Sequence, residues 1–199
     1  MARAADDPRT LVSRAMQRFR ENDVEAAVEL LDDVLQREPR LKPYLWQRGI
    51  ALYYIDEFDT AASQFRDDVK VNPSDTEEAV WEFISSCKRG DGDIGAAREN
   101  FLALRGGDRR KVMSSVLSLF RSGDENAKDV LVNLATRAAS DSDAFYSSLY
   151  LGLYAESMGD IAMARRWIEK ASETLYAQRG QDFMTAVADV HMARRGWTK

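Results

Sequence analysis

The sequence predicts an all-α protein built as one continuous array of repeated units, and two observations support this prediction. The first is composition: the 199 residues are 45% hydrophobic and 31% charged, with eleven glycines and four prolines, which is typical of a globular chain. The second is a period of 34 residues that relates Pro39 to Pro73 and Ala27 to Ala61. The same register also pairs Leu31 with Phe65 and Val24 with Phe58. Four coincidences in one register indicate an internal repeat.

Each residue type in this register has a packing role between helices. The alanines are small enough to let two helices approach closely, and the bulky residues on the next turn fill the groove between neighbouring units. A proline cannot continue a helix, because it has no backbone N–H to donate. Pro39 and Pro73 therefore mark the ends of successive units.

The unit over residues 42–75 carries the pattern best, in the segment LWQRGIALYYIDEFDTAASQF and the proline that follows it. Gly49 occupies a close-packing position, and Phe58, Ala61, Phe65 and Pro73 follow it at the repeat positions. With these residues the chain resembles the tetratricopeptide repeat (TPR) family, whose unit is two antiparallel helices. The resemblance implies a right-handed α-solenoid of about five helix pairs with a C-terminal capping helix.

The repeat makes residues 8–199 one array and leaves residues 1–7 as an N-terminal tail. The expected units cover residues 8–41, 42–75, 76–108, 109–141 and 142–177, with the capping helix over residues 178–196. The first unit matches less well, because Ala15 takes the glycine position. The third regains the register at Ala97, the fourth is degenerate, and the fifth matches again from Gly152. A capping helix is expected because the last unit would otherwise expose its apolar face.

The order of strong and degenerate units also resembles two narrower TPR groups. One is the bacterial outer-membrane lipoprotein that acts as an adaptor for a periplasmic protease and cell-wall enzymes, and the other is a set of uncharacterised plant and algal TPR proteins. No lipobox cysteine is present, so we do not expect a lipid anchor. No secretory signal and no apolar run of the ~18 residues that a membrane span needs are visible. We expect a soluble protein of the cytoplasm or of an organelle interior such as the chloroplast.

Residues suited to catalysis or metal binding are scarce, so we expect no enzymatic activity, no metal and no cofactor. The one cysteine, Cys87, excludes an intrachain disulfide, and the one histidine, His191, excludes a multi-histidine metal site. We interpret Cys87 as a small buried hydrophobe and His191 as a structural or surface residue. Asp67 and Asp68 are expected on a solvated outer face. The net charge of −5 argues against nucleic acid as the main partner.

Binding of a protein or peptide is the better-supported hypothesis. In a TPR array the first helix of each pair lines a concave groove, and Trp and Tyr are favoured at interfaces because they bury much area and keep a polar tip. The register assigns the following residues to this groove: Trp46, Gln47, Ile50, Tyr53, Tyr54, Trp81, Tyr146 and Tyr150. Aromatic residues at helical spacing also form the core between repeats, so both interpretations stay open for each of them.

Some TPR proteins bind the C-terminal carboxylate of chaperones through a clamp of Lys, Asn and Arg residues. At the matching positions this chain has Val12 and Met16, then Gln47, then Glu77 and Trp81. The chaperone carboxylate clamp is therefore absent, and Glu77 would repel such a ligand.

The sequence thus predicts a non-catalytic scaffold or adaptor that holds a peptide or a partner subunit in its concave groove. The alternative is a structural or assembly subunit of a larger complex, membrane-associated or organellar, that is bound through its convex face or its edges. The partner and the oligomeric state are not encoded in any motif of the chain.

Overall fold

The computed structural model describes residues 7–89, 92–137 and 140–197, and within these ranges the chain is helical and contains no strand. The expected N-terminal tail lies outside the described residues except for Asp7. The first half contains α1 (Pro8–Arg20), α2 (Val24–Arg37), the 3-10 helix η1 (Pro39–Tyr44), α3 (Trp46–Tyr54), α4 (Phe58–Val71), α5 (Thr76–Lys88) and α6 (Ile94–Glu99). The second half contains α7 (Lys111–Ser122), α8 (Glu125–Arg137), α9 (Asp141–Ser157), α10 (Ile161–Ser172), α11 (Leu175–Arg179) and α12 (Phe183–Arg194).

Aspartate side chains fix where several of these helices begin. The first N–H groups of a helix have no partner within it, and a carboxylate at the N-cap accepts their hydrogen bonds. Asp7 accepts from the backbone of α1, Asp75 from that of α5, and Asp182 from that of α12. Gly123 and Gly180 follow the ends of α7 and α11 in the left-handed conformation that glycine adopts without strain.

The same turn recurs at five places along the chain. In each, a residue with positive φ lies two positions before the second helix of a pair. These residues are Asn22 (φ 61°), Asp56 (φ 62°), Gly92 (φ 70°), Gly123 (φ 69°) and Gly159 (φ 81°). Asn and Gly tolerate the left-handed region better than most residues do. The recurrence shows that the repeated sequence pattern corresponds to a repeated local geometry.

Two glycines allow the helices of a pair to approach closely. A Cβ on Gly49 would lie 2.6 Å from the ring of Phe65, and a Cβ on Gly152 would lie 2.7 Å from Ile168. Each glycine precedes its bulky neighbour by 16 residues, so α3 meets α4 in the same way as α9 meets α10.

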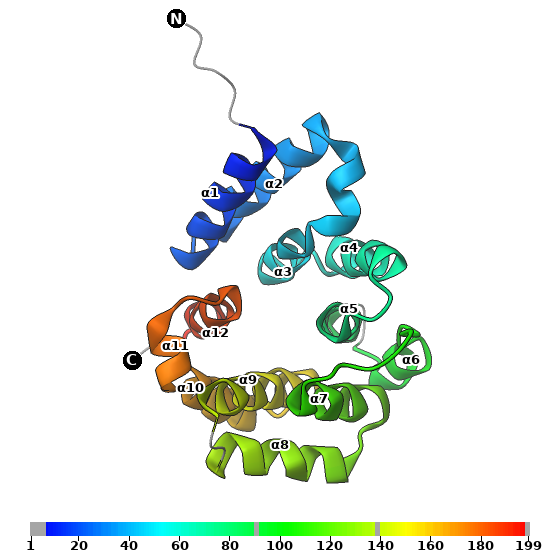
Figure 1. Ribbon diagram of the computed structural model, residues 1–199, viewed down its shortest axis with the longest axis vertical. Coiled ribbons are helices and arrows are strands. Elements are labelled where there is room, and N and C mark those ends of the chain that lie inside the picture. Colours follow the sequence, from blue (N-terminus) through cyan, green and yellow to red (C-terminus); the bar gives the residue numbers. More distant parts are fainter. Residues whose placement is uncertain (1–6, 90–91, 138–139, 198–199) are drawn as a thin grey trace, which may run out of the picture.

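The helices follow one another round an arc from α1 to α10, and α12 then returns to the inside of that arc (Figure 1). There Phe183 at the start of α12 packs against Phe19 of α1 and Trp46 of α3. At its other end, Arg194 binds Glu25 of α2 through two hydrogen bonds of 2.7 Å. The last helix therefore contacts the first pair as well as α10.

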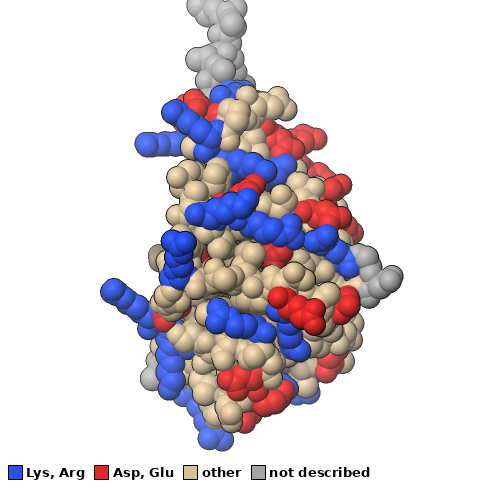
Figure 2. Space-filling view, turned by 90° about the vertical axis from the view of Figure 1, so that its right-hand side faces the viewer, with Lys and Arg blue, Asp and Glu red and all other residues tan. Residues whose placement is uncertain are grey.

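Over the described ranges, no helix combines the length and the apolar character that crossing a membrane would require. Basic and acidic side chains are interspersed over the face shown in Figure 2. Several charged side chains of the described residues pair along one helix, as Arg37 does with Asp33 and Arg165 with Glu169.

Candidate functional site

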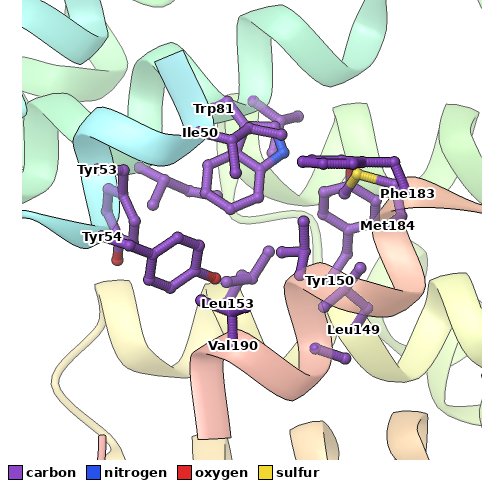
Figure 3. Close-up of a cluster of buried hydrophobic side chains, with 14 of the residues drawn as sticks. Ile50, Tyr53, Tyr54, Trp81, Leu149, Tyr150, Leu153, Phe183, Met184 and Val190 are labelled. Atoms are coloured by element: carbon purple, nitrogen blue, oxygen red, sulfur yellow. The ribbon is translucent and has the colours of Figure 1, made fainter. Parts of the chain in front are cut away.

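Most of the predicted groove residues lie in the interior between the arc and α12. Figure 3 shows these side chains from α3, α5 and α9 packed around Leu153 and Val190. The fully buried members are Ile50, Tyr53, Tyr54, Trp81 and Tyr150. Their rings contact one another, with centroid distances of 5.2 Å for Tyr53–Tyr54 and 5.5 Å for Tyr53–Trp81. The structure therefore places them in the core, which is one of the two interpretations that the sequence left open.

Of the other three predicted residues, Trp46 and Tyr146 contact the beginning of α12. Trp46 is half-buried and meets Phe183 edge to face at a centroid distance of 5.3 Å. Gln47 is half-buried, and its side-chain oxygen has no hydrogen-bond partner. Tyr146 donates a hydrogen bond of 2.6 Å to Asp182, the N-cap of α12.

A buried polar network fixes the far end of α12. Glu156 of α9 accepts hydrogen bonds from Arg195 Nε at 2.6 Å and from the hydroxyl of Tyr53 at 3.0 Å. Lys88 of α5 approaches the same carboxylate to 3.5 Å. Burial opposes the charged form of Glu156, but the attraction of His191, Arg195 and Lys88 outweighs it and lowers the pKa to about 2. The network joins α3, α5 and α9 to the C-terminal segment.

His191 belongs to this network as a neutral side chain. Burial lowers its pKa to about 4, so the imidazole is uncharged at pH 7. Its Nδ1 is 3.0 Å from the hydroxyl of Tyr54, and its ring lies against Trp197. The fully buried position fits the structural interpretation of His191 and not the surface one.

A pocket of about 250 Å³ stays open beside the start of α12. Its lining combines aromatic and acidic side chains from α3, α4, α5, α9 and α12. The lining residues are Trp46, Ile50, Phe65, Asp75, Glu77, Glu78, Trp81, Tyr146, Asp182 and Met184. Three of the predicted groove aromatics, Trp46, Trp81 and Tyr146, thus share one cavity with four carboxylates.

Three of these carboxylates have partners within the chain. Asp75 accepts from two backbone N–H groups at the start of α5. Glu77 binds Arg110 at 2.9 Å and the hydroxyl of Tyr150 at 3.0 Å. Asp182 accepts from Tyr146 at 2.6 Å and from Tyr176 at 2.7 Å.

The fourth carboxylate, Glu78, lacks a partner for Oε2, although the residue is only 8% exposed. Burial, together with the negative charges of Asp75, Asp68 and Glu77, raises the pKa of Glu78 to about 8. The indole N–H of Trp81 is a second buried polar group without a partner. In Figure 3 this nitrogen lies on the side of the ring nearer Phe183 and Met184.

The expectation that Asp68 lies on a solvated face is wrong. Asp68 is fully buried, and Gln64 donates a hydrogen bond of 3.1 Å to its Oδ1. Burial raises the pKa of Asp68 to about 7. The neighbouring Asp67 is half-buried and pairs with Lys42 and Lys70, as a residue near the surface does.

Cys87 is buried and free, as expected. Burial raises the pKa of its thiol to about 12, so the reactive thiolate is scarce at neutral pH. Within the described ranges, no three His, Cys, Asp or Glu side chains are placed to hold a metal ion together.

Sequence reasoning did not single out Glu78, Asp182, Lys88 or Arg195. A usable signal was present in the segment that forms α12, FMTAVADVHMAR, whose apolar residues lie all round the helix. A helix with this pattern is buried on most sides, whereas a cap of an array needs only one apolar face. Burial on most sides brings the residues that flank α12, Asp182 and Arg195, against Tyr146 and Glu156 of α9.

No protein-family model matches the chain, and a search of curated proteins finds no relative. The resemblance to the TPR family therefore stays a prediction, which rests on the residues and on the repeated geometry.

Proposed function

We propose that the chain is a non-catalytic scaffold of the TPR type that binds a segment of a partner protein. Its architecture would be a right-handed solenoid of five helix pairs, with α12 folded into the concave side. Two observations support this architecture: the turn that recurs at five places and the equivalent contacts of Gly49 with Phe65 and of Gly152 with Ile168.

The observation that carries the proposal is the open pocket next to α12. The helix covers most of the concave surface but leaves Trp46, Trp81 and Tyr146 around a cavity. Aromatic side chains that combine a large apolar area with a polar tip are the residues that dominate protein interfaces. A partner segment that enters the pocket would lie along the part of the concave surface that α12 does not cover.

The chemistry of the lining supports binding over catalysis. The pocket lining contains no Cys, Ser, His or Lys, and three of its four acidic side chains are already held by hydrogen bonds within the chain. The one histidine is buried within the Glu156 network and does not line the pocket.

Affinity purification from the native source tests the proposal with two variants that differ in one feature. Trp46→Ala removes a wall of the pocket, and Tyr44→Ala removes a nearby exposed aromatic that is not part of it. We expect the partner to be lost with Trp46→Ala and retained with Tyr44→Ala, while circular dichroism shows both variants folded. Equal recovery of the same partner with both variants would contradict the proposal.

A second candidate, a structural subunit bound through its edge, is favoured by one observation. Ile161 and Met163 at the start of α10 and Leu175 of α11 are exposed apolar side chains. A complex that survives Trp46→Ala but is lost with Ile161→Ser would support this candidate in place of the pocket.

A further inference from the structure

The pocket carries more negative charge than the chain neutralises. Four acidic side chains line it. The structure places one positively charged side chain, Arg110, in an ion pair with one of them, Glu77. The groups that act on Glu78 electrostatically are all acidic: Asp75, Asp68 and Glu77. These surroundings keep Glu78 largely protonated at neutral pH, and a positively charged ligand beside it would favour its ionised form.

Two buried polar atoms of the lining residues lack partners. Glu78 Oε2 is an acceptor that lacks a donor, and Trp81 Nε1 is a donor that lacks an acceptor. Both residues are more than nine-tenths buried, at 8% and 1% exposure. Buried polar groups are nearly always hydrogen-bonded, so these two atoms of pocket-lining residues are groups to which a ligand could supply the partners that the chain does not. That ligand would supply one donor and one acceptor.

The walls of the pocket suit an organic cation. Cations are attracted to the faces of Trp and Tyr rings, and Trp46, Trp81 and Tyr146 all line the cavity. The chain already uses this chemistry at one edge, where the guanidinium of Arg110 lies 5.7 Å from the ring centroid of Tyr146 and binds Glu77. A metal ion is disfavoured, because no three carboxylates of the described residues are placed to coordinate one.

We infer that the pocket binds the side chain of a Lys or Arg residue presented by a partner protein. The cationic head would donate to Glu78, with the aromatic rings along its aliphatic stem. A backbone carbonyl of the same segment would accept from the indole of Trp81, and this acceptor favours a peptide over a free amine. The inference rests on the proposed scaffold function and names the chemical class of its ligand.

NMR titration of the ¹⁵N-labelled chain tests the inference, with the indole resonance of Trp81 as the readout. The probes are the N-acetyl methylamides of lysine, arginine and norleucine, and putrescine serves as a free amine. We expect saturable shifts with lysine and arginine, and binding at least about tenfold weaker with norleucine and putrescine. Glu78→Gln should weaken lysine binding by a similar factor, whereas Glu99→Gln, an exposed carboxylate outside the pocket, should leave it unchanged.

Norleucine binding as tight as lysine binding, or no effect of Glu78→Gln, would overturn the inference. Putrescine binding as tight as lysine binding would overturn the protein partner in favour of a small amine. None of these results would by itself contradict the scaffold function, because partner recovery with Trp46→Ala is measured independently. The scaffold proposal would fail instead if the same amount of partner were recovered with Trp46→Ala and with Tyr44→Ala.

Discussion

At the residue scale, the unusual groups are carboxylates that face the inside of the molecule. Asp67 and Asp68 are adjacent in sequence and differ completely in surroundings. Asp68 lies three residues after Phe65 and therefore on the same buried side of α4, while Asp67 points away. The helical period contained this information, but the acidic pair was interpreted as one solvated unit. Charge is a weaker guide to burial than position on the helix when polar partners such as Gln64 are available.

Glu78→Gln should change how stability depends on pH. The folded-state pKa of Glu78, about 8, is above its ordinary value of 4.5. The contribution of Glu78 to the stability of the fold is therefore complete below pH 4.5 and is lost as pH rises through 8. The variant cannot ionise at this position and avoids that loss. We expect equal stability of the two proteins at pH 4.5 and a gain for the variant on the order of 5 kcal/mol at pH 9. Urea unfolding at both pH values measures this, and a gain that does not depend on pH would contradict it.

Gly49→Ala should destabilise the fold by overpacking. The new methyl group would meet the ring of Phe65, a buried side chain that cannot move aside freely. We expect a loss of about 1–3 kcal/mol in the free energy of unfolding. Gly107→Ala is the matched control, because a Cβ there meets no atom within 4 Å. A Gly49→Ala variant as stable as the control would show that the two helices are not in close contact.

At the element scale, the position of α12 is the main feature that the sequence did not predict. Local patterns located the helix pairs, because the 34-residue period, the glycines and the turns are properties of neighbouring residues. The surface that a terminal helix covers depends instead on residues far away in the chain. Tyr54 and His191, which share a hydrogen bond, are 137 positions apart. The repeat pattern therefore grouped the predicted groove residues but left open whether they are exposed or packed in the core.

Glu156→Gln should release α12. A buried ion pair that loses one partner leaves an uncompensated charge, which costs about 3–5 kcal/mol. We expect the free energy of unfolding to fall by this amount. We also expect amide hydrogen exchange to become faster in α12 than in α9. Glu25→Gln is the matched comparison, because it also removes an ion pair of the C-terminal segment, the more exposed one between Glu25 of α2 and Arg194 of α12. This substitution should cost less than about 1 kcal/mol. Similar effects of the two substitutions would contradict a central role for the Glu156 network.

Acid should weaken the packing of α12 through His191. The folded-state pKa of His191, about 4, is below its ordinary value of 6.5. The contribution of His191 to the stability of the fold is therefore complete above pH 6.5 and is lost as pH falls through 4. His191→Gln should therefore show a smaller loss of stability between pH 6.5 and 4 than the unmodified chain. Thermal unfolding across this range measures the difference, and parallel pH profiles would rule out the buried neutral histidine.

At the scale of the whole molecule, α12 turns an open array into a closed one. It contacts α1 and α10, and the residues that flank it, Asp182 and Arg195, bind Tyr146 and Glu156 of α9. On our proposal, the surface left for a partner is the pocket lined by Trp46, Trp81 and Tyr146. The binding scaffold stays a proposal, and its proposed site is reduced from a long groove to one acidic and aromatic cavity.

Photo-crosslinking tests most directly whether partners bind at this pocket. A benzophenone amino acid placed at Trp46 would face the cavity, and the same group placed at Val71, an exposed residue outside the pocket, provides the control. After irradiation in the native source, mass spectrometry identifies the crosslinked peptides. We predict that position 46 captures a segment of one partner that contains Lys or Arg, and that position 71 does not capture it. Capture of the same partner from position 71 and none from position 46 would contradict binding at the pocket.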